Sequence, residues 1–401
     1  MNALNREPPA KLPLSGIVVL EISDTPGAAF AGALLADFDA SVYVAETPAR
    51  GSAMRDRKPA EWWDILARNK KSVQINAAAT AAAGPVRALL AHAHIIVTDV
   101  PQAGRDVHPW LRHLGGLQKR PLLVDVIAPG SDRPELWPWS KTADLAGALT
   151  GMMALTGHAG QTPVQAEFPM VDYLAGALAA VRAMAELRRL RMQGGSAMDV
   201  VVPLHQAVQR MIEWQLPIAT AMGTPISRKG NSFPMSYSIS NMNRTKDGMY
   251  IAVSAANEAT AARLLNMLGG PELRDNPRYS TTLARQTSMP EIYAIMDKWV
   301  AERTFSEVLE TAHRHNVALG PIADARALAS DEHILGRGSV VRVARPDGSS
   351  MPMPAVVPRF AGWSKPIQSI GPARGAHTQE ALAECGFSSD AIGRLRVSGI
   401  I

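Results

Sequence analysis

The fold is indicated near the start of the chain, where residues 16–46 read GIVVLEISDTPGAAFAGALLADFDASVYVAE. The run Ile17–Ile22 is apolar and rich in β-branched residues, which predicts a buried strand. A turn rich in glycine and alanine follows, and residues 30–38 then place apolar side chains at helical spacing. Residues 41–46 predict a second strand. This order of strand, helix and strand predicts an α/β fold.

The same alternation continues through the first half of the chain. Apolar runs end near Ile75, Val97 and Val126, and residues 79–92 have the length of a covering helix. Strands that alternate with helices predict a parallel sheet with helices on its faces. We therefore expect a Rossmann-like large domain.

The second half predicts one long helix and a smaller α+β domain. The long helix is expected from Asp172 to about Met192, where a double glycine ends it. Residues from about 234 to 322 contain the Asp247-Gly248 turn and shorter patterns of both strand and helix. The predicted domains are residues 12–220 for the large α/β domain, 221–335 for a linker and the small α+β domain, and 336–401 for a C-terminal segment.

Composition excludes several classes of protein. Of 401 residues, 47% are hydrophobic and 19% are charged, and the net charge is +5, which disfavours a disordered chain and a strongly basic nucleic-acid binder. Cys385 is the single cysteine, and residues 1–15 lack the apolar core of a secretory signal, so we expect a cytoplasmic protein without an internal disulfide. The longest uncharged stretch, residues 145–166, is broken by Pro163 and predicts no membrane span.

Short motifs narrow the chemistry further. Residues 27–32 read GAAFAG rather than GxGxxG, so this helix start serves either packing or a nucleotide-like ligand, without indicating NAD. Neither a GxSxG elbow nor a Walker motif is present, and the two His-x-His pairs lack further ligands at metal spacing. Asp172 remains, in the sequence FPMVDYLAG of residues 168–176. An aspartate at a helix start either caps N–H groups or, in a dry pocket, attacks a thioester or anhydride carbon.

Seven segments in this order resemble the class III CoA-transferase family, which includes formyl-CoA transferase, carnitine CoA-transferases and α-methylacyl-CoA racemases. They read PLSGIVVLE at 13–21, LLAD at 34–37, RNKKSV at 68–73, LTGMMALTG at 149–157, PMVDYLAG at 169–176, RTKDG at 244–248 and GAHT at 375–378. The resemblance implies that residues 336–401 return to the large domain. It also implies a homodimer of two interlocked, ring-like chains.

By this resemblance Asp172 is the catalytic nucleophile, and the protein moves CoA from an acyl-CoA thioester to a free carboxylic acid. Coenzyme A takes part as the substrate and product thioester, and no metal, nucleic acid or membrane partner is expected. The resemblance assigns CoA binding to loops beyond the strand ends, where open α/β sheets bind ligands. The assigned residues are Pro26, Gly27, Thr47, Ile75, Asn76, Asp99, Val100, Arg105, Lys141, Thr142 and Ala143, with Arg105 and Lys141 as the cations for phosphate.

Two alternatives stay open. A racemase needs two acid/base groups, and racemases of this family carry a His-Asp pair where this chain has Thr142-Ala143-Asp144. A non-catalytic CoA-binding member is the other alternative, because Val44, Thr47 and residues 98–100 depart from the family pattern. Residues 135–139, which read ELWPW, also depart from it and predict an apolar acyl pocket.

Overall fold

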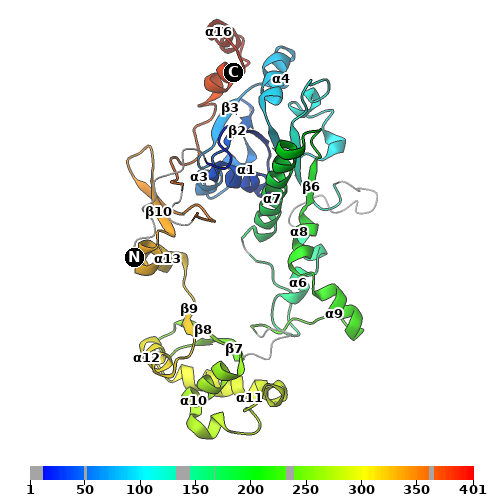
Figure 1. Cartoon of the computed structure of the whole chain (residues 1–401). Coiled ribbons are helices and arrows are strands. Elements are labelled where there is room, and N and C mark those ends of the chain that lie inside the picture. The colour runs from blue at the N-terminus through cyan, green and yellow to red at the C-terminus, as the bar shows by residue number, and fades with distance from the viewer. Residues whose placement is uncertain (1–11, 49–51, 132–144, 167, 232–238, 361–364) are drawn as a thin grey trace. The chain divides into compact units, whose positions relative to one another are not determined.

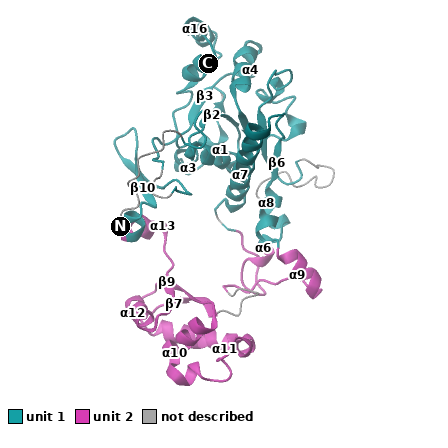
Figure 2. Ribbon diagram, in the orientation of Figure 1, with its two compact units in different colours: residues 1–152, 166–213, 333–401 teal, residues 153–165, 214–332 magenta. Residues whose placement is uncertain are grey.

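The computed structural model describes residues 12–48, 52–131, 145–166, 168–231, 239–360 and 365–401 (Figure 1). The chain divides into two compact units (Figure 2). The large unit takes residues 1–152, 166–213 and 333–401, and the small unit takes residues 153–165 and 214–332. The first strand and the last helix of the chain therefore belong to the same unit.

A six-stranded parallel sheet forms the centre of the large unit. Its strands are β1 Val18–Ile22, β2 Ser41–Glu46, β3 Lys71–Gln74, β4 Ile95–Thr98, β5 Leu122–Ile127 and β6 Val200–Pro203. Their order is β3-β2-β1-β4-β5-β6, which is the doubly wound order that reverses direction between β1 and β4. β4 and β5 are buried along their whole length, as strands covered on both faces are. The predicted α/β class and parallel sheet are confirmed.

Helices cover both faces of this sheet because successive residues of each strand point to opposite sides. Val19 packs on the face covered by α1 and α7, and Leu20 packs on the face covered by α4 and the C-terminal helices. One face carries α1 Pro26–Asp37, α7 Met170–Gln193 and α8 Leu204–Met211, and the other carries α4 Ala83–His92, α15 Thr378–Glu384 and α16 Ser389–Val397.

Small residues allow α1 and α7 to approach closely. Ala31 of α1 and Ala175 and Ala179 of α7 are fully buried in the same core. A Cβ atom built on Gly176 of α7 would lie 2.4 Å from the carbonyl oxygen of Gly27 in α1. Only glycine fits at this crossing, so the sequence of both helices sets their separation.

The rest of the large unit consists of short elements. They are α2 Ala53–Asp56, α3 Glu61–Leu66, α5 Ala146–Leu149, the 3-10 helices Thr80–Ala82, Gln102–Gly104 and Leu111–His113, and the hairpin β10 Val340–Ala344 and β11 Ser350–Pro354. α6 Met152–Leu155 and α14 Glu332–Gly336 stand where the sequence passes from one unit to the other. The C-terminal segment ends in two helices, α15 and α16.

The small unit is built on an antiparallel sheet of β7 Ile239–Arg244, β8 Tyr250–Ala255 and β9 Leu319–Pro321, in that order. Its helices are α9 Gln215–Met222, α10 Glu258–Arg274, α11 Thr282–Ala301, α12 Phe305–His315 and α13 Ala325–Ser330. The motif at residues 244–248 makes the turn between β7 and β8, and Gly248 takes the positive φ of 87° that the turn requires. Within the described residues, no helix is long and apolar enough to cross a membrane.

Candidate active site

A cavity of about 160 Å³ lies where the strand order of the large unit reverses. Doubly wound sheets bind their ligands at this place, beyond the carboxyl ends of the strands. The cavity is smaller than the roughly 300–1,000 Å³ of a pocket for a drug-sized ligand, so it accommodates only part of a large ligand. Its walls are Ile22, Ser23 and Asp24 after β1, Ala45 and Thr47 of β2 and its end, Asp99 and Val100 after β4, and His108 and Trp110.

The cavity presents two carboxylates and one imidazole. The Asp24 N–H donates to Asp99 Oδ2 at 2.8 Å, and burial raises the pKa of Asp99. His108 Nδ1 accepts from the N–H groups of Trp110 at 3.3 Å and Leu111 at 3.4 Å. Burial lowers the pKa of His108, so the ring is neutral and carries its proton on Nε2. The cavity therefore offers the two carboxylates as hydrogen-bond acceptors and the imidazole N–H as a donor.

Asp172 lies where the N-termini of two helices meet. It is the third residue of α7, and its Oδ1 accepts a hydrogen bond of 3.2 Å from the N–H of Gly27, the second residue of α1. The residue is 8% exposed. Both helix N-termini carry partial positive charge, which stabilises the carboxylate in its ionised form. The prediction of a first-turn aspartate is confirmed, and the residue at the N-cap is Pro169.

An aromatic pair joins the same two helices. Phe30 of α1 and Tyr173 of α7 stack with 4.4 Å between ring centroids and 7° between ring planes. They form one end of a second cavity of about 190 Å³, whose other walls include Leu34, Ile65 and Val357. This second cavity is mainly apolar and contacts the residue next to Asp172.

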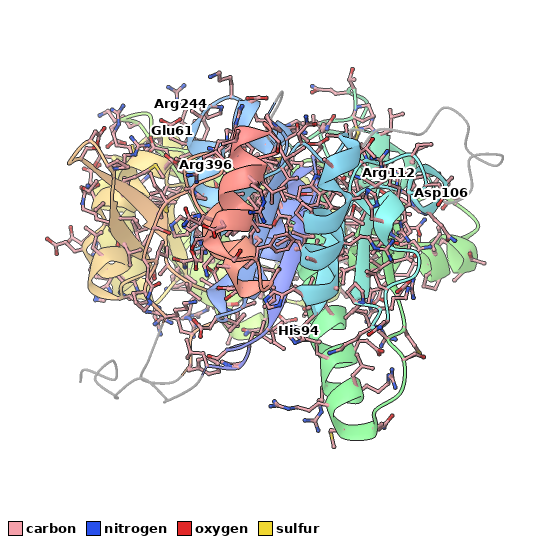
Figure 3. The ribbon with its side chains drawn as sticks, turned by 90° about the horizontal axis from the view of Figure 1, so that it is seen from above. Glu61, His94, Asp106, Arg112, Arg244 and Arg396 are labelled. Carbon is pink, nitrogen blue, oxygen red and sulfur yellow. The ribbon has the colours of Figure 1, made fainter. Side chains whose placement is uncertain are left out.

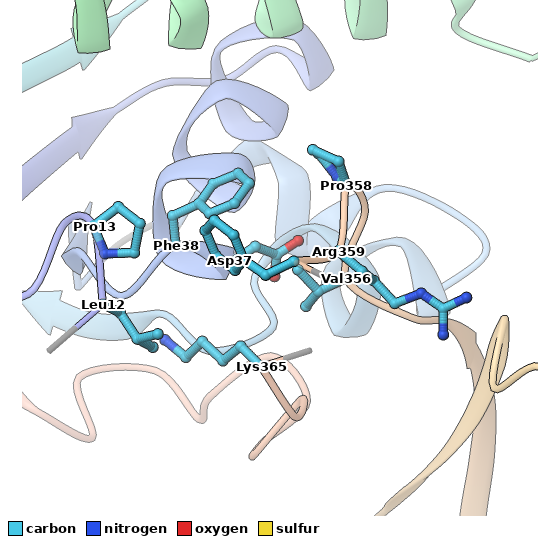
Figure 4. Close-up of a pocket in the computed structure, with 9 residues that line it drawn as sticks. Leu12, Pro13, Asp37, Phe38, Val356, Pro358, Arg359 and Lys365 are labelled. Atoms are coloured by element: carbon cyan, nitrogen blue, oxygen red, sulfur yellow. The ribbon is translucent and has the colours of Figure 1, made fainter. Parts of the chain in front are cut away.

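A third pocket lies at the opposite end of α1, where Lys365 donates to Ala36 O at 2.9 Å and to Asp39 Oδ1 at 2.8 Å (Figure 4). Its volume of about 10 Å³ is close to the minimum for a single water molecule, so it is too small for a substrate. Among the described residues, no group of three or more His, Cys, Asp or Glu side chains is arranged to hold a metal ion.

Arg55 of α2 ties the end of β2 to the C-terminal segment. Arg55 binds Glu46 through Nε and Nη2, each at 2.9 Å, and donates to Pro372 O at 3.0 Å. Burial opposes ionisation of Glu46, but hydrogen bonds from Arg55, Ser72 and the Ser52 N–H outweigh it and lower the pKa of Glu46. The buried Glu46 carboxylate thus fixes the strand end from which Thr47 reaches the cavity.

The structure brings together several of the residues assigned by resemblance. Thr47, Asp99 and Val100 line the cavity. Pro26 and Gly27 are the first two residues of α1, and in the sequence they come shortly after Asp24, which also lines the cavity. Lys141, Thr142 and Ala143, together with the tryptophans of residues 135–139, lie outside the described residues.

Three other assigned residues are engaged within the protein. The Ile75 side chain is fully buried, and the Asn76 N–H donates to Ile400 O at 2.8 Å. The same loop is held by Arg112, which donates to the Ala77 carbonyl at 3.2 Å. Arg112 is labelled in Figure 3. Arg105 forms an ion pair with Asp125, and only 12% of its side chain is exposed.

Residues 14–378 match the sequence model of CoA-transferase family III. The chain belongs to this family. The match covers the sheet, Asp172 and the small unit, and it confirms the resemblance inferred from the seven motifs. The protein is therefore an enzyme of the CoA-transferase class.

Several relatives match the chain over nearly its whole length. The chain is 28% identical to the succinyl-CoA–D-citramalate CoA-transferase of Chloroflexus aurantiacus, over 97% of this chain and 98% of that protein. It is 24% identical to the succinyl-CoA:glutarate CoA-transferase of Mus musculus, over 97% and 90%. The crystal structure of a CAIB/BAIF family protein from Brucella suis has the same fold, with a TM-score of 0.79 at 20% identity, over 94% of this chain and all of that one.

The family motifs did not reveal two of the polar residues that line the cavity. Asp24 is the second residue after β1, so its place after the first strand of a doubly wound sheet was the available signal. His108 stands in a segment of irregular structure, and its position gave no such signal. His108 lines the cavity because the segment that follows β4 folds back toward the ends of the strands.

Proposed function

We propose that this family III CoA-transferase moves CoA from an acyl-CoA thioester to a free carboxylic acid through covalent intermediates on Asp172. The observation that carries the proposal is the hydrogen bond between Asp172 Oδ1 and the Gly27 N–H at the meeting point of two helix N-termini. This contact orients an ionised carboxylate, and an oriented carboxylate of this kind is a competent nucleophile.

The reaction proceeds by four exchanges at carbonyl carbons. Asp172 attacks the thioester carbon and expels the CoA thiolate, which leaves a mixed anhydride. The thiolate then attacks the Asp172 carbonyl carbon, releasing the donor acid and leaving an aspartyl-CoA thioester. The acceptor carboxylate attacks this thioester, and the thiolate returns to the acceptor's carbonyl carbon. The new acyl-CoA departs and the Asp172 carboxylate is restored.

The α1 N-terminus also stabilises the transition states. Each attack on a carbonyl carbon develops negative charge on oxygen, next to the partial positive charge of the helix end. Asp172 is only 8% exposed, and its burial protects the anhydride and the thioester from hydrolysis by limiting the access of water. These features suit acyl transfer better than proton abstraction.

We assign the cavity at the switch point to a neutral part of CoA. Asp24 and Asp99 accept hydrogen bonds and repel phosphate, so the group that enters must carry N–H or O–H donors. The assignments of Pro26, Gly27, Thr47, Asp99 and Val100 to CoA are compatible with this placement. CoA phosphates then lie outside the cavity.

We further propose that the active protein is an interlocked homodimer. α9 has a mainly apolar sequence, and it buries none of its residues within the chain. Leu216 is 70% exposed and Met222 is 59% exposed. Apolar surface of this kind is typical of a site where another protein surface packs.

The test combines a substrate panel with a matched pair of variants. Purified protein is incubated with succinyl-CoA or a branched acyl-CoA and a panel of carboxylic acids, and new CoA thioesters are identified by mass spectrometry. Transfer should be observed for the native protein. Asp172→Asn should lower the rate on the order of 10⁴-fold, because the amide retains the size of the side chain but is no nucleophile.

Glu307→Gln is the matched control, because Glu307 is also the third residue of a helix, α12, and accepts a hydrogen bond from the Thr304 N–H at 2.8 Å. It should leave the transfer rate unchanged. Near-native turnover by Asp172→Asn, with deamidation excluded, would show that Asp172 is only a helix-terminal residue. Absence of transfer by the native protein across the panel would favour a non-catalytic role.

A further inference from the structure

A buried ion pair lies directly beneath α1. Lys70 Nζ donates to Glu21 Oε2 at 2.6 Å and to the carbonyl oxygen of Ala29 at 2.7 Å. Glu21 is on β1, Lys70 precedes β3, and Ala29 is in the first turn of α1, so one ammonium group joins three elements. Lys70 and Glu21 are each 2% exposed.

The pair is a poor means of stabilising the fold. Removing two charges from water costs several kcal/mol per ion, and an apolar pair of the same volume is often as stable or more stable. Burial raises the pKa of Glu21 and lowers the pKa of Lys70, in keeping with that penalty. The hydrogen bonds of Lys70 therefore matter more for the groups that they hold in position than for the stability of the fold.

α1 rests directly on the Glu21 carboxylate. A Cβ atom built on Gly32 would overlap Glu21 Oε2, so glycine at this position is what allows the helix to sit on the pair. Glu21 Oε1 also accepts from Ser23 Oγ at 3.3 Å, and Ser23 lines the cavity at the switch point. The pair thus supports α1 from below, close to the end of β1.

The turn that Lys70 holds is the turn that contacts Asp172. Ala29 lies two residues after Gly27, and its own N–H donates to Thr25 O at 3.2 Å, which closes the first turn of α1. The Gly27 N–H lies 3.2 Å from Asp172 Oδ1, at the long end of the range for such bonds. A small shift of this turn is therefore enough to break the contact with the carboxylate.

We propose that Lys70 is a positioning residue for CoA transfer: by holding the Ala29 carbonyl, it keeps the first turn of α1 where the Gly27 N–H orients Asp172. This inference rests on the proposed role of Asp172. Lys70 acts through α1 and touches no substrate. Its loss slows the attack by Asp172 far more than it weakens CoA binding.

The adjacent lysine provides a matched control. Lys71 Nζ forms an ion pair with Glu380 Oε1 at 2.7 Å, and 28% of its side chain is exposed. Lys70→Met and Lys71→Met remove the same charge from consecutive residues. We expect Lys70→Met to lower the single-turnover rate constant about 100-fold, as misplacement of a reacting group by about 1 Å does, with little change in the Kd for CoA. Lys71→Met should keep the native rate.

A double variant separates positioning from charge balance. Lys70→Met alone leaves Glu21 buried without its cation, whereas Glu21→Gln/Lys70→Met leaves no unpaired charge and should fold even where the single variant does not. If Lys70 only neutralises Glu21, the double variant will regain the native rate. If Lys70 positions α1, the double variant will stay slow, because the Ala29 carbonyl still lacks its donor.

Hydrogen–deuterium exchange gives a readout that does not depend on activity. Faster exchange in the peptide containing Gly27 and Ala29 is expected in the double variant, and native exchange there would overturn the inference. So would a native rate of transfer in the double variant. Failure of the native protein to transfer CoA would instead overturn the proposed function, and the exchange experiment would still test whether Lys70 holds α1.

Discussion

Replacing Gly176 by alanine should separate α1 from α7 and slow CoA transfer. The built Cβ atom lies 2.4 Å from Gly27 O and 3.1 Å from Ala31 N, and both are backbone atoms that cannot rotate away. Since real Cβ contacts are essentially never shorter than 3.0 Å, the two helices must part by at least 0.6 Å. The Gly27 N–H contact with Asp172, now 3.2 Å, then lengthens by up to about 0.6 Å, which takes it beyond hydrogen-bond range.

The expected effect on stability is modest and the effect on rate is large. Overpacking costs about 1–3 kcal/mol, and the better helix propensity of alanine offsets about 0.5–1 kcal/mol of this. The melting temperature of Gly176→Ala should therefore fall by only a few degrees. The transfer rate should fall about 100-fold, because a reacting carboxylate is displaced.

The assay is single-turnover transfer, with Gly84→Ala as the control. Gly84 is in α4, and a Cβ atom built on it meets nothing within 4 Å. This control should be slightly more stable than the native protein and equally fast. A native transfer rate in Gly176→Ala would refute the argument that the α1–α7 spacing sets the geometry of Asp172.

Three further predictions concern pH, proton exchange and assembly. Hydrogen bonds from Arg189 and the Met198 N–H lower the pKa of Glu186 from 4.5 to about 2, so its contribution to stability is complete above pH 4.5 and is lost as the pH falls toward 2. Glu186→Gln should therefore lose less thermal stability than the native protein between pH 4.5 and 2, and parallel curves would contradict this assignment. An α-methyl-branched acyl-CoA in heavy water should gain little deuterium at its α-carbon, because Thr142-Ala143-Asp144 lacks the histidine of the racemases; rapid stereorandom exchange would favour a racemase. Sedimentation at submicromolar concentration should show a species near twice the 42.9 kDa chain mass, and a folded monomer that exchanges rapidly with dimer would exclude interlocking.

Clear apolar periods in the sequence predicted the elements that carry the site. Elements whose sequences mix polar and apolar residues without a period were not predicted. The two strands and the helix of residues 16–46 and the long helix from Asp172 follow clear apolar periods, and the structure confirms them. α11 contains Pro290, which argues against a helix in sequence, and β7 reads ISNMNR with few apolar residues. Both elements form because the core of the small unit buries side chains such as Ile239 and Ile292.

Contacts between distant residues were beyond sequence patterns. Asp172 was recognisable from its motif and its helix start, but its partner Gly27 is 145 residues away. Arg105 was assigned to phosphate by resemblance, and its ion pair with Asp125, inside β5, could not be read from the sequence. Such pairings depend on the order of strands in the sheet, which the sequence does not display.

The most direct test of the account is to trap the intermediate on Asp172. The native protein is mixed with an acyl-CoA that it uses, treated with hydroxylamine and digested, and the peptides are sequenced by mass spectrometry. Hydroxylamine converts an aspartyl anhydride or thioester to a hydroxamate, so we predict a hydroxamate on Asp172 that forms only when acyl-CoA is present. Ongoing transfer without a hydroxamate at Asp172, or with one on another carboxylate, would contradict the account.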